Sequence, residues 1–176
     1  MPGYGANPVS GGNSVSHEPH VEDRGHSGLE GLREVAEENR RLIESLDVHM
    51  EALTRRVCPT CRDVCCISRH GRPAADDLVY YKALNLVPPP SEPDRPDTSP
   101  CHQLGASGCR LPRAERPYRC TWYFCTPLIE ALDRLPARQA RVLDAQLSRL
   151  SSARIRLVET HAAIEADPLH PDPYGR

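Results

Sequence analysis

The chain has 176 residues, enough for one compact domain with extensions, but an aromatic content of 5% and 18 prolines predict only a small apolar core. Its formal net charge of −2 excludes a strong field that would attract nucleic acid or an anionic membrane. The N-terminus lacks the segments of a signal peptide, and no apolar run could cross a bilayer, so we expect no membrane partner and a cytoplasmic location, where thiols stay reduced.

Residues 1–26 are rich in glycine and polar residues, so we expect a disordered tail. An amphipathic helix over 27–57 follows, because Ser27 and Glu30 fit a capping box. Apolar residues then repeat every seven positions, as in a helix that packs against another helix. The two repeated positions hold Leu29, Ala36, Ile43, Met50 and Val57, and Leu32, Asn39, Leu46 and Leu53. The partner helix could come from a second copy, but the sequence favours one from the same chain.

The middle and the end of the chain predict shorter elements. Residues 74–86 fit a short helix, and residues 88–100 hold six prolines, which predict an extended loop. Gly105 and Gly108 predict the turn of a small hairpin. Thr126 is expected to cap a short helix, and Pro136 to begin a longer one that ends near Asp167. One face of that helix carries Leu143, Leu147, Leu150, Leu157 and Ile164, with Arg154 and His161 interrupting the stripe.

These elements predict a mainly α fold with a small, irregular, cysteine-rich core and two long flanking helices packed antiparallel. We divide the chain into five parts. They are a disordered tail (1–26), an amphipathic helix (27–57), a cysteine-rich metal-binding domain (58–125), a helical C-terminal arm (126–167) and a loose tail (168–176).

All eight cysteines lie between residues 58 and 125. Their order is Cys58-x2-Cys61-x3-Cys65-Cys66, then Cys101-x7-Cys109-x10-Cys120-x4-Cys125. In a reducing compartment such a cluster favours metal ligands over disulfides. Two cysteines separated by two residues can bind one ion from a tight turn. A redox pair with the same spacing normally opens a helix after a strand, whereas Cys58 follows a long helix.

The adjacent cysteines indicate how the two halves of the motif could be joined. In an extended segment, neighbouring side chains point to opposite faces. We therefore expect one of Cys65 and Cys66 to complete a site with Cys58 and Cys61, while the other reaches toward the second group.

Residues around the cysteines suggest what would surround a metal. We expect Trp122, Tyr123 and Phe124 to form an apolar shell, and His70 and His102 to be reserve ligands. Some of the flanking arginines are expected to donate hydrogen bonds to sulfur or to line the site. These are Arg56, Arg62, Arg69, Arg110, Arg113, Arg116 and Arg119.

The cysteine spacing, together with the segment Arg116-Pro117-Tyr118-Arg119-Cys120, resembles the YkgJ-like cysteine-cluster family, whose signature is CxxCxxxCC. That family is described as a zinc- or iron-chelating domain, and some members are labelled iron–sulfur proteins. The resemblance covers residues 58–125 and implies that all eight cysteines bind metal. It implies nothing specific about a substrate.

Three functions follow as hypotheses. The first is a small protein that holds an iron–sulfur cluster or zinc, with electron transfer or iron–sulfur-dependent chemistry if iron is bound. The dispersed cysteines favour a cluster over zinc, which usually takes two short chelate loops. The second is a structural zinc module whose helices bind a protein partner. The third is a cluster-dependent enzyme that modifies another protein, although the sequence contains no recognisable catalytic constellation or phosphate-binding loop.

Overall fold

The computed structural model describes residues 21–62 and 64–167. Within these residues the chain forms six α-helices, two short 3-10 helices and one two-stranded hairpin. In chain order they are α1 (Val21–Val57), η1 (Cys58–Thr60), α2 (Ser68–Gly71), α3 (Ala75–Ala83), β1 (Leu104–Gly105), β2 (Gly108–Cys109), η2 (Arg113–Glu115), α4 (Arg119–Trp122), α5 (Thr126–Asp133) and α6 (Ala137–Ala166).

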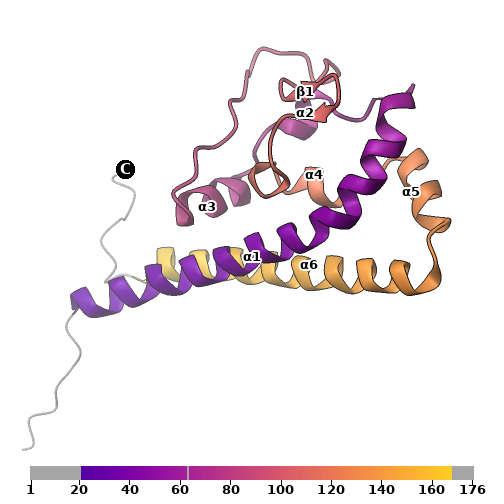
Figure 1. Cartoon of the computed structure of the whole chain (residues 1–176). Helices are drawn as coiled ribbons and strands as arrows, with labels where there is room; N and C mark the ends of the chain where they lie inside the picture. The colour runs from indigo at the N-terminus through magenta and orange to yellow at the C-terminus, as the bar shows by residue number, and fades with distance from the viewer. Residues whose placement is uncertain (1–20, 63, 168–176) are drawn as a thin grey trace, which may run out of the picture.

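Two long helices, α1 and α6, pack against each other, and the last part of α1 diverges from α6 and lies beside α5 (Figure 1). Three contacts give their direction. Near the start of α1, Gly28 lies against Ile164, and further along Arg156 donates to Glu38 at 2.6 Å. Further still, the Gln146 amide donates to the Ser45 carbonyl at 3.4 Å. Since positions rise along α1 as they fall along α6, the helices are antiparallel. The predicted fold class and the same-chain partner are confirmed.

The seven-residue pattern of α1 is the centre of the core. Its inner positions are at most 4% exposed, whereas Leu29 near one end is 39% exposed. The buried apolar residues of this stripe are Leu32, Ala36, Ile43, Leu46, Met50 and Leu53. They meet Leu143, Leu150 and Leu157 of α6 in one continuous cluster. Because each large side chain contributes about 1.5–3 kcal/mol on burial, this interface is a main source of stability.

One heptad position of α1 is polar. The Asn39 side chain is fully buried, and its amide donates to the carbonyl of Val35 at 2.9 Å and of Ala153 at 3.0 Å. The second bond crosses to α6, so it is made only when the two helices are in this register. A buried asparagine in such a seam is a known way to specify alignment at some cost in stability.

The predicted helix ends need two corrections. Helix α1 begins at Val21, so the predicted start at Ser27 is wrong; residues 1–20 and 168–176, which belong to the predicted tails, lie outside the described residues. At α5 the capping residue is Cys125, with extended backbone (ψ 162°), and Thr126 is already helical. The long last helix, α6, has the predicted extent.

The cysteine-rich segment lies on one side of the helix pair (Figure 1). Helix α3 joins it to the core through two buried tyrosines. Tyr80 donates to the Ala114 carbonyl at 3.1 Å, and Tyr81 donates to the Glu115 carbonyl at 3.2 Å. The predicted hairpin is present, with Gly108 at φ 115° in its turn, a conformation that glycine adopts without strain.

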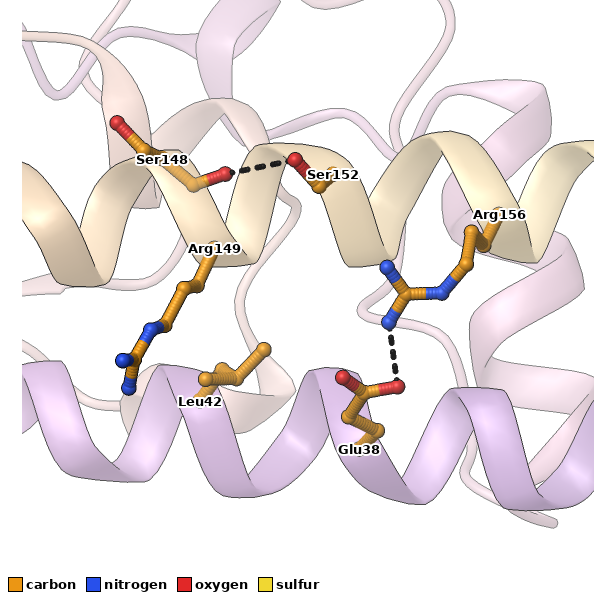
Figure 2. A pocket seen from close by; sticks show the side chains of 6 residues that line it. All are labelled: Glu38, Leu42, Ser148, Arg149, Ser152 and Arg156. Atoms are coloured by element: carbon orange, nitrogen blue, oxygen red, sulfur yellow. Dashed lines mark hydrogen bonds and ion pairs between the residues drawn. The ribbon is translucent and has the colours of Figure 1, made fainter.

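The outer side of the helix pair bears an open groove of about 550 Å³ (Figure 2). Its lining residues are Glu38, Leu42, Ser148, Arg149, Ser152 and Arg156. The ion pair between Arg156 and Glu38 crosses it. Of the helices in the described part of the chain, none is both long enough and apolar enough to cross a membrane.

Candidate metal centre

Two segments far apart in the sequence meet in a single antiparallel bridge. The Cys101 amide donates to the Cys66 carbonyl at 2.8 Å, and the Ser68 amide donates to the Ser99 carbonyl at 2.7 Å. Between them, Ile67 and Pro100 form an isolated bridge. This pairing places the backbones of Cys66 and Cys101 next to each other.

The short helix α2 packs against two further parts of this region. A Cβ atom added to Gly71 would lie only 2.5 Å from the Cys101 sulfur, so the sulfur rests against the glycine backbone. The Cys120 thiol, from α4, donates to the His70 carbonyl at 3.6 Å. Cys101 and Cys120 therefore both contact α2.

The hairpin brings Cys109 close to Cys101. The Leu104 amide donates to the Cys101 carbonyl at 3.0 Å, and Leu104 pairs with Cys109 across the two strands. Burial, together with the neighbouring thiols of Cys109 and Cys101, raises the pKa of Cys120 to about 12. Cys66 in turn lies within electrostatic reach of Cys58 as well as of Cys120 and Cys109, and its backbone pairs with that of Cys101. We call Cys66, Cys101, Cys109 and Cys120 the second thiol group.

The remaining four cysteines gather where α1 ends and α5 begins. Cys58 opens η1, and the Cys61 amide turns back to the Cys58 carbonyl at 3.2 Å. Burial raises the pKa of Cys58, and the nearby thiols of Cys65, Cys125 and Cys61 raise it further. We call Cys58, Cys61, Cys65 and Cys125 the first thiol group.

The two groups adjoin through the Cys65 thiol, which interacts with the thiols of both Cys66 and Cys125. The interaction with Cys66, assisted by burial, raises the pKa of Cys65. The same interaction lowers the pKa of Cys66 and outweighs the effect of burial.

The eight cysteines, all within the described residues, form no disulfide, and each is partly buried. Across residues 21–62 and 64–167, no three His, Cys, Asp or Glu side chains converge closely enough to hold a metal ion. The sulfurs are neighbours, but their side chains would have to rotate toward a common point to become ligands.

Neither predicted reserve ligand is directed at the sulfurs. Nδ1 of His70 lies 2.9 Å from the Cys65 carbonyl oxygen, and Nε2 accepts from Arg69 at 3.3 Å. Its ring also packs on Tyr123 at a centroid distance of 4.5 Å. His70 thus holds the backbone of the first thiol group. His102 pairs with Glu92 at 3.2 Å and is half exposed.

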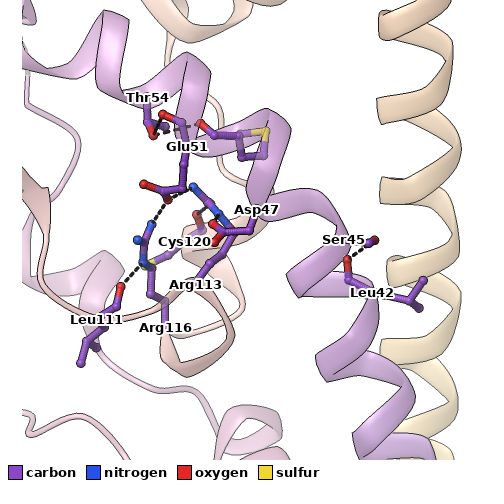
Figure 3. Close-up of polar contacts among 10 residues, drawn as sticks. Leu42, Ser45, Asp47, Glu51, Thr54, Leu111, Arg113, Arg116 and Cys120 are labelled. Atoms are coloured by element: carbon purple, nitrogen blue, oxygen red, sulfur yellow. Dashed lines mark hydrogen bonds and ion pairs between the residues drawn. The ribbon is translucent and has the colours of Figure 1, made fainter.

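Two of the flanking arginines bind carboxylates of α1 (Figure 3). Arg113, with its side chain only 2% exposed, pairs with Asp47 at 3.1 Å and with Glu51. Arg116 pairs with Glu51 at 2.9 Å. Burial alone would raise the pKa of Glu51, but Arg116 and Arg113 outweigh it and hold that pKa below its ordinary range. Arg116 also acts to lower the pKa of Cys120, so positive charge lies near the second thiol group.

A second ionic contact ties the cysteine-rich segment to α6. Arg154 is 5% exposed and donates to Asp76 at 3.0 Å and to Asp77 at 2.6 Å. Its guanidinium also lies over the Tyr118 ring, 4.9 Å from the centroid. Asp77 accepts further bonds from the amides of Tyr118 and Ala74, each at 2.9 Å. The residue that seemed to interrupt the apolar stripe of α6 is therefore a structural anchor.

The predicted aromatic shell is only partly present. Phe124 packs against the core, but Trp122 and Tyr123 are 46% and 38% exposed, so these two do not enclose the sulfurs. Thr121, next to Cys120, is 1% exposed, and its hydroxyl has no hydrogen-bond partner in the described structure. A buried hydroxyl without a partner is unfavourable and is a donor available to a neighbouring anion.

These features define a mainly helical protein with a cysteine-rich region fixed to an antiparallel helix pair. Comparison with known proteins gave no matching family model, no similar curated protein and no similar solved structure. The resemblance to the YkgJ-like family stays a prediction from the motifs.

Proposed function

We propose that the protein binds metal through its clustered cysteine thiolates, as an iron–sulfur cluster or as zinc. The observation that carries the proposal is the gathering of all eight cysteines, none in a disulfide, beside the helix pair, where neighbouring thiols shift one another's pKa. Such a gathering brings together the groups that bind soft metals best.

The electrostatics of the thiols fit this role. Burial and neighbouring thiols raise the pKa of Cys58, Cys120 and Cys125, which means that several thiolates together are unfavourable without a cation. A bound cation reverses this balance and deprotonates its thiol ligands. The nearby Arg116 and the buried Thr121 hydroxyl are suited to offset the negative charge that an all-thiolate site retains.

Zinc and iron place different demands on these residues. All-thiolate shells suit both, but zinc sites are commonly built from two short chelate loops, and in this chain only Cys58 and Cys61 have the shortest, two-residue spacing. The dispersed cysteines of the second thiol group favour an iron–sulfur cluster. An iron–sulfur cluster bound by the second thiol group would supply one-electron chemistry.

A structural zinc module that binds a protein partner is the second candidate. It is supported by apolar residues that α6 leaves exposed. Val142, Ile155 and Val158 are 43%, 56% and 43% exposed, respectively. In this function the metal would only stabilise the fold, and the helices would contact the partner.

Metal analysis combined with visible spectroscopy of anaerobically purified full-length protein tests the proposal. Iron with the visible absorption of thiolate-bound iron would support a cluster, and colourless protein with stoichiometric zinc would support the structural module. Cys58→Ser and Cys61→Ser should lose metal. Protein that contains neither metal, with its cysteines paired as disulfides, would contradict metal binding altogether.

A further inference from the structure

Two adjoining aromatic side chains of the cysteine-rich segment are exposed directly after Cys120. Trp122 ends α4 and is 46% exposed, and Tyr123 follows it and is 38% exposed. Their rings meet edge to face, with centroids 6.5 Å apart. Single apolar residues are common on protein surfaces, whereas adjoining aromatic rings in contact with water are typical of a binding surface.

The neighbouring His70 of α2 fixes the Tyr123 ring. The two ring centroids are 4.5 Å apart, and His70 itself is only 8% exposed. Arg69 donates from Nε to Nε2 of His70 at 3.3 Å, so Nδ1 carries the proton and donates to the Cys65 carbonyl at 2.9 Å. Because both ring nitrogens are engaged, the aromatic surface is preorganised, which reduces the entropy that a partner must offset on binding.

Positive charge lies at both ends of this row of rings. Arg119 precedes Trp122 by three positions in α4, so the two side chains share one face of that helix. Arg69 lies at the edge of the His70 ring, and α2 and α4 pack against each other. Both arginines are exposed, and neither has a carboxylate partner among the residues that the structure describes. We call Arg69, Arg119, Trp122 and Tyr123 the aromatic–arginine surface.

The segments that carry this surface are basic, although the whole chain is not. Residues 64–72 and 109–125 contain six arginines and one acidic residue, Glu115, whereas the formal charge of the chain is −2. Arg72 pairs with Asp97, and Arg113 and Arg116 pair with carboxylates of α1. Within the described part of the chain, the arginines left without a carboxylate are Arg69, Arg110 and Arg119. This excess of positive charge complements an acidic partner.

We infer that the aromatic–arginine surface binds an acidic segment of another protein. Carboxylates of that segment pair with Arg69 and Arg119, and one of its apolar side chains packs on Trp122. Tryptophan, tyrosine and arginine are the residues that most often dominate protein–protein affinity. The net negative charge of the chain opposes nucleic acid as the partner. The inference goes beyond the proposed metal binding, and it places the partner on the cysteine-rich segment and not on the long helices.

Fluorescence titration of anaerobically purified full-length protein tests the inference, because Trp122 is the only tryptophan of the chain. The probe is a short synthetic peptide with the repeating sequence Glu-Glu-Phe. We expect a saturable change in Trp122 emission that weakens as salt is added and that is absent when lysine replaces glutamate in the peptide. Arg119→Glu should weaken binding about tenfold or more, the effect of losing one dominant contact. Arg149→Glu makes the same charge change in the groove of the helix pair and should bind like the unaltered protein.

Calorimetry measures the same binding for Trp122→Ala, which lacks the fluorescent group. Since Trp122 is half exposed, this change should leave the fold intact and weaken binding about tenfold. Failure of the Glu-Glu-Phe peptide to bind, or equal effects of Arg119→Glu and Arg149→Glu, would overturn the inference. Tighter binding of oligothymidylate would overturn it in favour of nucleic acid, and a dimer that Trp122→Ala dissociates would overturn it in favour of self-association. Each of these outcomes leaves the proposed metal binding intact.

Discussion

Gly71 lies so close to the Cys101 sulfur that a methyl group has no room there. We predict that Gly71→Ala lowers the free energy of unfolding by about 1–3 kcal/mol, the usual effect of overpacking. Gly31→Ala is the matched control, because nothing lies within 4 Å of its added Cβ in α1. That change should instead raise the free energy by about 0.5–1 kcal/mol through helix propensity. Urea unfolding of both variants measures the difference, and equal effects would contradict the close approach.

Glu51 predicts a pH dependence. Since its pKa in the folded protein lies below the ordinary 4.5, its contribution to stability is complete above pH 4.5 and is lost as the pH falls through the folded value. Glu51→Gln should therefore cost about 1–3 kcal/mol at pH 7, and the difference from the unaltered protein should shrink at acid pH. Urea unfolding from pH 7 to pH 3 measures it. Glu44→Gln, in an exposed pair with Arg40, should differ little at any pH.

At the level of single residues, the grouping of the cysteines was not predictable from the sequence. The alternation of an extended chain predicts that the Cys65 and Cys66 side chains face opposite ways, whereas in the structure their thiols interact and the Cys66 backbone pairs with Cys101. The position of Cys125 was not predictable, because the chain leaves α4 at Trp122 and runs extended through Tyr123 to the cap of α5. Cys120 and Cys125 are therefore in different thiol groups, although only five positions separate them in the sequence.

At the level of elements, Arg154 of α6 and Asp77 of α3 join the helix pair to the cysteine-rich segment. We predict that Asp77→Asn costs about 3–5 kcal/mol, because it leaves a buried guanidinium with only one carboxylate and weakens the bond to the Tyr118 amide. Glu38→Gln, which removes an exposed partner of Arg156, should cost at most about 1 kcal/mol. Urea unfolding compares them, and a small loss for Asp77→Asn would show that this contact is dispensable.

The long helices were predictable, and their polar attachments were not. Burial follows the helical period, so the apolar stripes of α1 and α6 can be recognised from spacing alone. Arg154 and Asp77 are separated by 77 positions, and no local period relates them. The same holds for Arg113 and Glu51, which is why the sequence suggested that Arg113 lies near sulfur rather than beside a carboxylate.

For the whole molecule, metal removal should affect the two layers unequally. The long helices supply most of the residues of the apolar core, whereas the cysteine-rich segment has strands of two residues and helices of four to nine. If metal is bound, a chelator under reducing conditions should abolish amide protection over residues 58–125 and leave the buried faces of α1 and α6 protected. Hydrogen exchange with and without chelator measures this. Equal loss in both layers would show that the helices also depend on the metal.

The cysteine-rich segment in turn depends on the two long helices, and this dependence has a practical consequence. Arg113 meets its carboxylates on α1, and Asp77 meets its guanidinium on α6. A fragment cut at residues 58 and 125 would keep every sulfur and yet leave these two charges bare, along with the tyrosine faces that the long helices cover. Excision of the motif therefore yields a poor mimic of the intact molecule, and the smallest useful unit extends from the start of α1 to the end of α6.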